Sequence, residues 1–178
     1  MNKLKLIIIL CSITLVFALS ACGKSSGSGS ESGDPCEQVA AAFAKAIQDQ
    51  SGEEYMNLHP DDLIQDRING WNYTKEEVIE EFGEKAKDSY DYISEGEENV
   101  KIKYMVSNKK HLDKDELAKL NYDMQDCFEF RKDCITDAYK VKFRFYAKGK
   151  KNVINTSTDY VVKVDGKWYR QYNPNDEG

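Results

Sequence analysis

The sequence of 178 residues has only two histidines and three prolines, and it lacks any long hydrophobic run. Its longest largely apolar stretch, residues 6–19, covers 14 positions, whereas a membrane-spanning helix needs roughly 20. No His-x-x-x-His or Cys-x-x-Cys spacing occurs, so the common zinc motifs are missing. An excess of positive charge is also missing, because 31 acidic residues outnumber 25 basic ones. The net charge of −6 argues against a general nucleic-acid binder.

What is present fits a folded domain. Hydrophobic residues make up 40% of the chain and aromatic residues 11%, which excludes a wholly disordered protein. Residues 34–178 contain no internal repeat and no second linker. Their 145 residues are enough for a single hydrophobic core that buries about 70% of the surface of the unfolded chain. We therefore predict one domain over 34–178.

The first 22 residues form a targeting pattern. Lys3 and Lys5 precede the apolar stretch, and residues 19–23 read Leu-Ser-Ala-Cys-Gly. Small residues directly before Cys22 resemble the lipobox of bacterial lipoproteins. In that family the cysteine thiol carries diacylglycerol, and the signal peptide is cut off just before the cysteine, here between Ala21 and Cys22. The resemblance implies a signal peptide at 1–21 and a protein held by its lipid on the extracytoplasmic face of the cell membrane. The alternative is an ordinary secretory leader.

Residues 23–33 consist almost entirely of glycine and serine. Such a segment is expected to behave as a flexible tether with a root-mean-square length of about 17 to 20 Å. Two acyl chains suffice for stable anchoring to a bilayer, whereas one is marginal. Loss of residues 1–21 removes two lysines and no acids, so the mature chain carries a net charge of −8.

Hydrophobic periodicity divides the domain into a helical half and a sheet half. Three capping patterns open helices at Asp34, Ser51 and Thr74, and a fourth opens a helix over 113–128. After Gly96 the period changes to two, which predicts antiparallel strands. The expected helices are 35–50, a short one after 51, 61–68 before an Asn-Gly turn, and one after 74. The expected strands are 100–106, 139–148, 154–164 and 167–172, with an Asp-Gly hairpin at 165–166.

Charge follows the same division. Residues 34–98 carry 18 acidic and 5 basic side chains, a net charge of −13. Residues 99–178 carry 12 acidic and 17 basic side chains, a net charge of +5. The predicted helical half is thus strongly acidic and the predicted sheet half basic.

The predicted helices come first and are followed by a meander of long strands, which ends in Val-Asp-Gly-Lys-Trp-Tyr at residues 164–169. This arrangement resembles the nuclear transport factor 2-like superfamily. The Leu-His-Pro break at 58–60 is a second shared feature. The resemblance covers about 35–173 and implies an α+β cone, in which a curved antiparallel sheet wraps around a long helix. The helix 113–128 departs from the minimal cone and is expected to cover or narrow its mouth. A cystatin-like grip is the competing fold.

Enzymes of this superfamily place an Asp or His base inside the cone, often with a tyrosine as hydrogen-bond donor. Asp61 and Asp62 begin a helix, where capping explains them. The neighbours of Asp159 in phase on its strand are Ser157, Val161 and Lys163, and Asp159 is expected at the surface. The sequence His59-x-Asp61-Asp62 is a weak metal triplet because no further histidine accompanies it. We therefore predict no catalytic residue, no metal and no cofactor.

Three cysteines stay in the domain, in addition to the predicted lipid attachment site. Cys127 and Cys134 flank the end of the helix at 113–128, and an extracytoplasmic location permits a disulfide between them. The alternative is that these two and Cys36 are buried thiols, because spacing alone does not establish disulfide geometry.

Two surface patterns suggest binding sites. Basic residues alternate along two strands and are expected to share one face of the sheet, either as an ordinary solvated face or as a contact for anionic lipid or wall polymer. These residues are Lys101, Lys103, Lys140, Lys142 and Arg144. Aromatic side chains with a polar tip suit the lining of a cone pocket, and the candidates are Tyr104, Tyr160 and Trp168.

Three functions are consistent with the sequence. The first is a non-enzymatic, membrane-anchored module that binds a small ligand or an envelope component. The second is a cone enzyme of isomerase or hydratase type. The third is an accessory domain that interacts with cell-wall machinery. No nucleic-acid partner is expected, and the sequence does not predict the oligomeric state.

Overall fold

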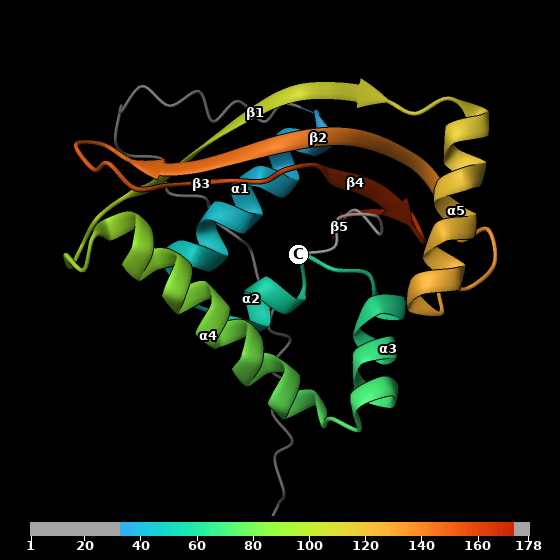
Figure 1. The fold of residues 1–178 in the computed structure, drawn as a ribbon, viewed down its shortest axis with the longest axis horizontal. Helices are drawn as coiled ribbons and strands as arrows, with labels where there is room; N and C mark the ends of the chain where they lie inside the picture. Colours follow the sequence, from blue (N-terminus) through green and yellow to red (C-terminus); the bar gives the residue numbers. More distant parts are fainter. Residues whose placement is uncertain (1–32, 173–178) are drawn as a thin grey trace, which may run out of the picture. The chain divides into compact units, whose positions relative to one another are not determined.

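A computed structural model describes residues 33–172 (Figure 1). The predicted signal peptide, its cleavage site at Ala21, the lipid site Cys22 and most of the tether lie outside the described residues, as does the tail 173–178. Among the helices of the described part, none has the length and apolar character needed to cross a membrane.

Four helices form the N-terminal half. They are α1 (Pro35–Gln48), α2 (Gly52–Met56), α3 (Asp61–Trp71) and α4 (Lys75–Ser94). Side-chain caps mark the starts of α1, α2 and α4 but not that of α3. Asp34 accepts a hydrogen bond from the Cys36 backbone N–H at 3.0 Å, and Thr74 with Glu77 forms a complete capping box. The turn predicted at 69–70 is wrong, because α3 continues through both residues to Trp71 and is capped by Asn72, whose φ is +53°.

Five antiparallel strands follow. The strands are β1 (Ile102–His111), β2 (Ile135–Ala147), β3 (Val153–Asn155), β4 (Asp159–Val164) and β5 (Lys167–Tyr172). Their order is β1-β2-β4-β5, with β3 also paired to β2, and α5 (Lys114–Phe128) lies between β1 and β2 in sequence. This confirms the predicted α+β class, in which N-terminal helices pack on an antiparallel sheet.

Two details of the sheet bear on the sequence predictions. The predicted strand 154–164 is interrupted: the Phe143 backbone N–H donates to the hydroxyl of Thr156, and β4 begins only at Asp159. The predicted hairpin is confirmed, since Asp165 and Gly166 have φ values of +49° and +83°, as a type I′ turn requires.

The main core lies between the helices and one face of the sheet. Phe43 of α1, Phe82 of α4 and Phe145 of β2 are almost fully buried there, and the rings of Phe43 and Phe145 lie 4.5 Å apart. Figure 1 shows α1, α2 and α4 together on one side of the sheet. We call this side the inner face.

A second cluster fills part of the opposite, outer face. Leu120 and Met124 of α5 pack with Ala138 and Val162 there. Asn121 locks the helix to the sheet, because its amide donates to the Ile135 carbonyl at 2.9 Å and accepts from the Ile135 N–H at 3.0 Å. The helix at 113–128 therefore builds its own core on the outer face.

The closest approach of α2 and α4 depends on glycine. A Cβ on Gly52 would lie 1.9 Å from the Ile79 carbonyl oxygen and 2.8 Å from the Gly83 nitrogen. No side chain fits between these backbones, so α2 can pack against α4 only with glycine at position 52.

Candidate functional site

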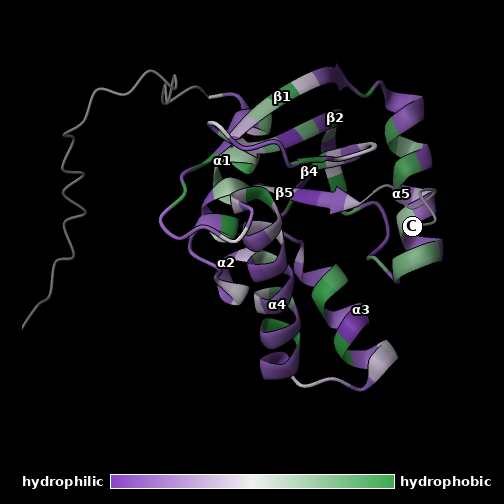
Figure 2. Ribbon diagram, turned by 60° about the vertical axis from the view of Figure 1, so that its left-hand side comes forward, coloured by the Kyte–Doolittle hydropathy of each residue, from purple (hydrophilic) through white to green (hydrophobic). Residues whose placement is uncertain are grey.

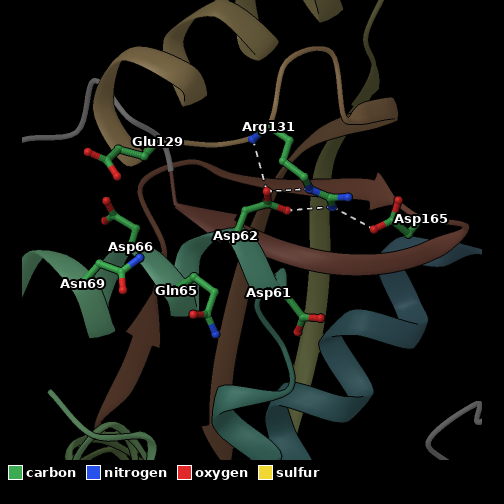
Figure 3. Close-up of a pocket in the computed structure, with 8 residues that line it drawn as sticks. All are labelled: Asp61, Asp62, Gln65, Asp66, Asn69, Glu129, Arg131 and Asp165. Carbon is green, nitrogen blue, oxygen red and sulfur yellow. Dashed lines mark hydrogen bonds and ion pairs between the residues drawn. The ribbon is translucent and has the colours of Figure 1, made fainter.

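A surface hollow of about 370 Å³ lies beside α3 (Figure 3). It brings together α3, the segment that leads from α5 to β2, and the hairpin between β4 and β5. The lining residues are Asp61, Asp62, Gln65, Asp66, Asn69, Glu129, Arg131 and Asp165. Five carboxylates against one guanidinium give the lining a net charge of −4.

Arg131 holds one side of this hollow together. Its Nε and Nη2 atoms lie 2.8 and 2.9 Å from the two carboxylate oxygens of Asp62, and Nη2 also lies 2.7 Å from Asp165 (Figure 3). The Arg131 backbone N–H donates to Asp62 as well. These hydrogen bonds from Arg131 are the main cause that keeps the pKa of Asp62 below its ordinary value, although partial burial acts in the opposite direction.

The other side of the hollow has unneutralised acids. The carboxylates of Asp66 and Glu129 point toward one another from opposite walls (Figure 3). Burial raises the pKa of Asp66, and the nearby charge of Glu129 raises it further. Histidine and cysteine are missing from this lining, and nowhere in residues 33–172 are three or more metal-ligating side chains grouped to hold an ion. The hollow suits a ligand with positive charge better than it suits acid–base chemistry.

A second polar group lies inside the domain. Asp159 is 3% exposed and Arg170 is 5% exposed, and the guanidinium Nε donates to the Asp159 carboxylate at 2.9 Å. The guanidinium also lies 4.3 Å from the ring centres of Phe43 and Tyr172. The prediction of a surface position for Asp159 is wrong, because its side of β4 is the inner face, which the helices cover.

His59 joins this buried group from the segment between α2 and α3. Its ring stacks on Phe82 and Tyr172, and its Nδ1 lies 3.0 Å from the Arg170 carbonyl. A carbonyl oxygen can only accept, so Nδ1 carries the hydrogen. Burial, followed by the nearby charge of Arg170, holds the pKa of His59 well below its ordinary value. His59 is therefore neutral, and its Nε2 has no partner among the described residues.

The arrangement does not reproduce the acid of an isomerase-type cone enzyme. That chemistry uses a carboxylic acid kept neutral by apolar surroundings, whereas the buried carboxylate here has a guanidinium as its partner. The weak triplet of His59, Asp61 and Asp62 also separates in space, because His59 is buried and Asp61 is exposed at the hollow.

The five predicted basic residues do gather on one side. Lys103 lies in β1 and Lys142 and Arg144 lie in β2, and the register places them on the outer face. Lys140 continues the same alternation, and Lys101 directly precedes β1.

The three aromatic candidates do not line one cavity. Tyr104 and Trp168 pack against the main core from the inner face, whereas Tyr160 packs against the second cluster. None of them contributes to the hollow beside α3.

In the described part of the chain, Cys36, Cys127 and Cys134 all have free thiols. Cys36 is buried, Cys134 is half-buried and Cys127 is exposed, so the alternative of three buried thiols holds for Cys36 alone.

Neither Arg131 nor Arg170 is a candidate from the sequence. The strict alternation of Trp168, Arg170 and Tyr172 is the one signal that points to a charge on the inner face.

Comparison of the chain with protein-family models, with curated proteins and with solved structures finds no match.

Proposed function

We propose that this chain is a lipid-anchored module on the extracytoplasmic face of a membrane, which binds a small ligand or an envelope partner and does not act as an enzyme. The Leu-Ser-Ala-Cys pattern before Gly23 supports the anchor. The observation that favours binding over catalysis is the ion pair of Asp159 with Arg170, because it occupies the buried acid that a cone enzyme would need free.

The hollow beside α3 is the candidate ligand site under this proposal. It is open to solvent, its lining has a net charge of −4, and Arg131 fixes the positions of Asp62 and Asp165 in advance. A ligand with an ammonium or guanidinium group is complementary to Asp66 and Glu129. Such compounds can be titrated into the protein while the chemical shifts of its backbone amides are recorded by NMR. The amide signals of the loop 129–131 and of α3 should shift. Asp66→Asn with Glu129→Gln should abolish the shifts.

We also propose that the domain is a cone of the nuclear transport factor 2-like type. The order of helices before strands and the packing of α1, α2 and α4 on one face of an antiparallel sheet are consistent with it. Under this proposal α5 is an addition that packs on the outer face.

Metabolic labelling with a fatty acid tests the anchor. The full chain should incorporate the label and appear in the membrane fraction, and Cys22→Ala should lose the label and keep residues 1–21. Cys127→Ala is the matched control, because its thiol is exposed and lies in the folded domain. An unlabelled wild-type chain would show that Cys22 carries no lipid.

An enzyme of isomerase or hydratase type is the second candidate, and one observation favours it. His59 is a buried neutral imidazole with a free Nε2, and Tyr55 lies 6.2 Å from it between ring centres. If the domain is an enzyme, His59→Gln should abolish turnover of a substrate while binding persists. If it is a binding module, no compound that binds should be converted by the wild-type protein.

A further inference from the structure

The outer face of the sheet carries an uncompensated positive patch. We call Lys101, Lys103, Lys140, Lys142 and Arg144 the basic face. Residues 101–107 and 140–146 contain no acidic side chain. Within the described residues none of the five takes part in an ion pair, whereas Lys45, Lys87 and Lys119 on the helices each have a carboxylate partner. The chain has a net charge of −6, so five unpaired cations on one surface are a marked segregation of charge.

An exposed apolar group lies inside the basic face. Met105 is 49% exposed, and the register sets it directly opposite Arg144 and two residues from Lys103. The ring of Tyr146 lies next along the same face, 5.8 Å from the Arg144 guanidinium. Along β1 and β2, Figure 2 shows hydrophilic and hydrophobic residues in alternation. Cations around an exposed methionine combine electrostatic attraction with apolar insertion, the two terms that bind proteins to anionic bilayers.

The start of the domain lies next to the same strand. Lys109 of β1 forms an ion pair with Asp34 at 2.6 Å, and Asp34 is the N-cap of α1. The described chain therefore begins beside β1, an edge strand of the sheet, whereas the end of α1 lies near Lys101 and Lys103, where Gln48 contacts Val100 and Ile102. A segment of about 11 residues between that edge and Cys22 has an expected length of about 17 to 20 Å, which brings the basic face within reach of the lipid surface.

We infer that the basic face docks on the anionic surface of the membrane. The inference rests on the proposed lipid anchor, which keeps the domain close to the bilayer. Because α1, α2 and α4 cover the inner face, docking turns the acidic helical half away from the lipid and lowers its repulsion. The hollow beside α3 shares no residue with the basic face.

Vesicle sedimentation of the chain from residue 23 onward tests the docking without the lipid anchor. This chain should bind vesicles of phosphatidylcholine with phosphatidylglycerol, and it should not bind phosphatidylcholine alone. Lys103→Glu with Lys142→Glu should weaken binding by at least about 25-fold, since each cation near an anionic leaflet contributes roughly five-fold. Lys75→Glu with Lys132→Glu makes the same change of net charge at exposed positions away from the basic face, and it should change binding by less than two-fold.

Each other outcome is decisive. Equal losses in the two double variants would show that net charge alone matters and would overturn the docking site, as would the absence of binding to the anionic vesicles. Binding to soluble polyphosphate without binding to vesicles would assign the basic face to an anionic polymer instead. If Cys22 proves to carry no lipid but the vesicles are still bound, the proposed anchor is refuted and the docking surface is supported.

Discussion

Arg170 and Asp159 form an ion pair in the interior of the domain, with 2.9 Å between Nε and Oδ2 and almost no exposure of either side chain. Transfer of two charges from water costs several kcal/mol for each ion, and the attraction between them offsets this cost only while both are present. The pair lies on adjacent strands of the inner face, under Phe43 of α1. The ion pair therefore links β4 to β5 at the place where α1 packs on the sheet.

Loss of the carboxylate should destabilise the domain strongly. Asp159→Ala leaves the Arg170 charge buried without its ion-pair partner, and we expect the free energy of unfolding in urea to fall by about 3 to 5 kcal/mol. Asp159→Val combined with Arg170→Met should recover most of this loss, because it removes both charges. The matched control is Asp137→Ala, whose half-exposed carboxylate contacts His111 and should contribute at most about 1 kcal/mol. A loss no larger than that of the control would contradict the buried charge pair.

Stability should depend on pH through His59. Its pKa in the folded protein lies well below the ordinary value of 6.5, so the unfolded chain binds more protons below pH 6.5. The contribution of neutral His59 to the free energy of unfolding is therefore fully present above about pH 6.5. It falls as the pH drops below this value, by about 1.4 kcal/mol per pH unit at most. Urea melts between pH 7.5 and 5 measure this slope. His59→Phe should remove most of the slope.

The glycine at the start of α2 should be irreplaceable. Gly52→Ala places a methyl group against the Ile79 carbonyl and the Gly83 nitrogen, and we expect thermal unfolding to report a loss of about 1 to 3 kcal/mol. Gly70→Ala is the matched control, because nothing lies within 4 Å of its Cβ and alanine favours a helix. That variant should be neutral or gain up to about 1 kcal/mol. Equal effects at both positions would contradict the close approach of α2 and α4.

Arg131 should be needed to keep the hollow in shape. In Arg131→Lys the charge persists but the two-pronged contact with Asp62 is lost, so we expect a loss of stability of about 1 kcal/mol at pH 7. The depressed pKa of Asp62 stabilises the fold above its ordinary value of 3.8, and this contribution disappears as the pH falls through the folded pKa. The difference between variant and wild type should therefore shrink near pH 3. Lys132→Ala, one residue further along, should show no such pH dependence.

Thiol labelling should rank the cysteines. Burial raises the pKa of Cys36 to about 12, so this thiol should react with a maleimide at pH 8 only after unfolding. Cys127 is exposed and should react at once, and Cys134 should be slower because burial raises its pKa.

Mass spectrometry of the oxidised protein tests the predicted disulfide between Cys127 and Cys134. Protection of Cys127 in that sample, reversed by a reductant, is the result expected if the bridge forms.

Local sequence patterns determine most of the elements of this protein. The Thr74–Glu77 and Asp113–Glu116 boxes mark the starts of α4 and α5 because each box satisfies its own backbone donors within one turn. The Asp165–Gly166 pair fixes the last hairpin, since a type I′ turn needs a positive φ at both residues. The same period of two that predicts β1 and β2 also places the basic face on one side, because alternation follows from strand geometry alone.

The tertiary structure alone decided which polar groups lie inside. Ser157 and Lys163 lie in phase with Asp159 and indicate a surface position, but the helices cover this side of β4 and Arg170 on the neighbouring strand β5 forms an ion pair with Asp159. Arg131 meets Asp62 across 69 residues, and no local pattern encodes such a contact. Periodicity specifies which side chains share a face of a strand. Whether that face is buried, and which charge comes to oppose which, depends on how helices distant in sequence pack on the sheet.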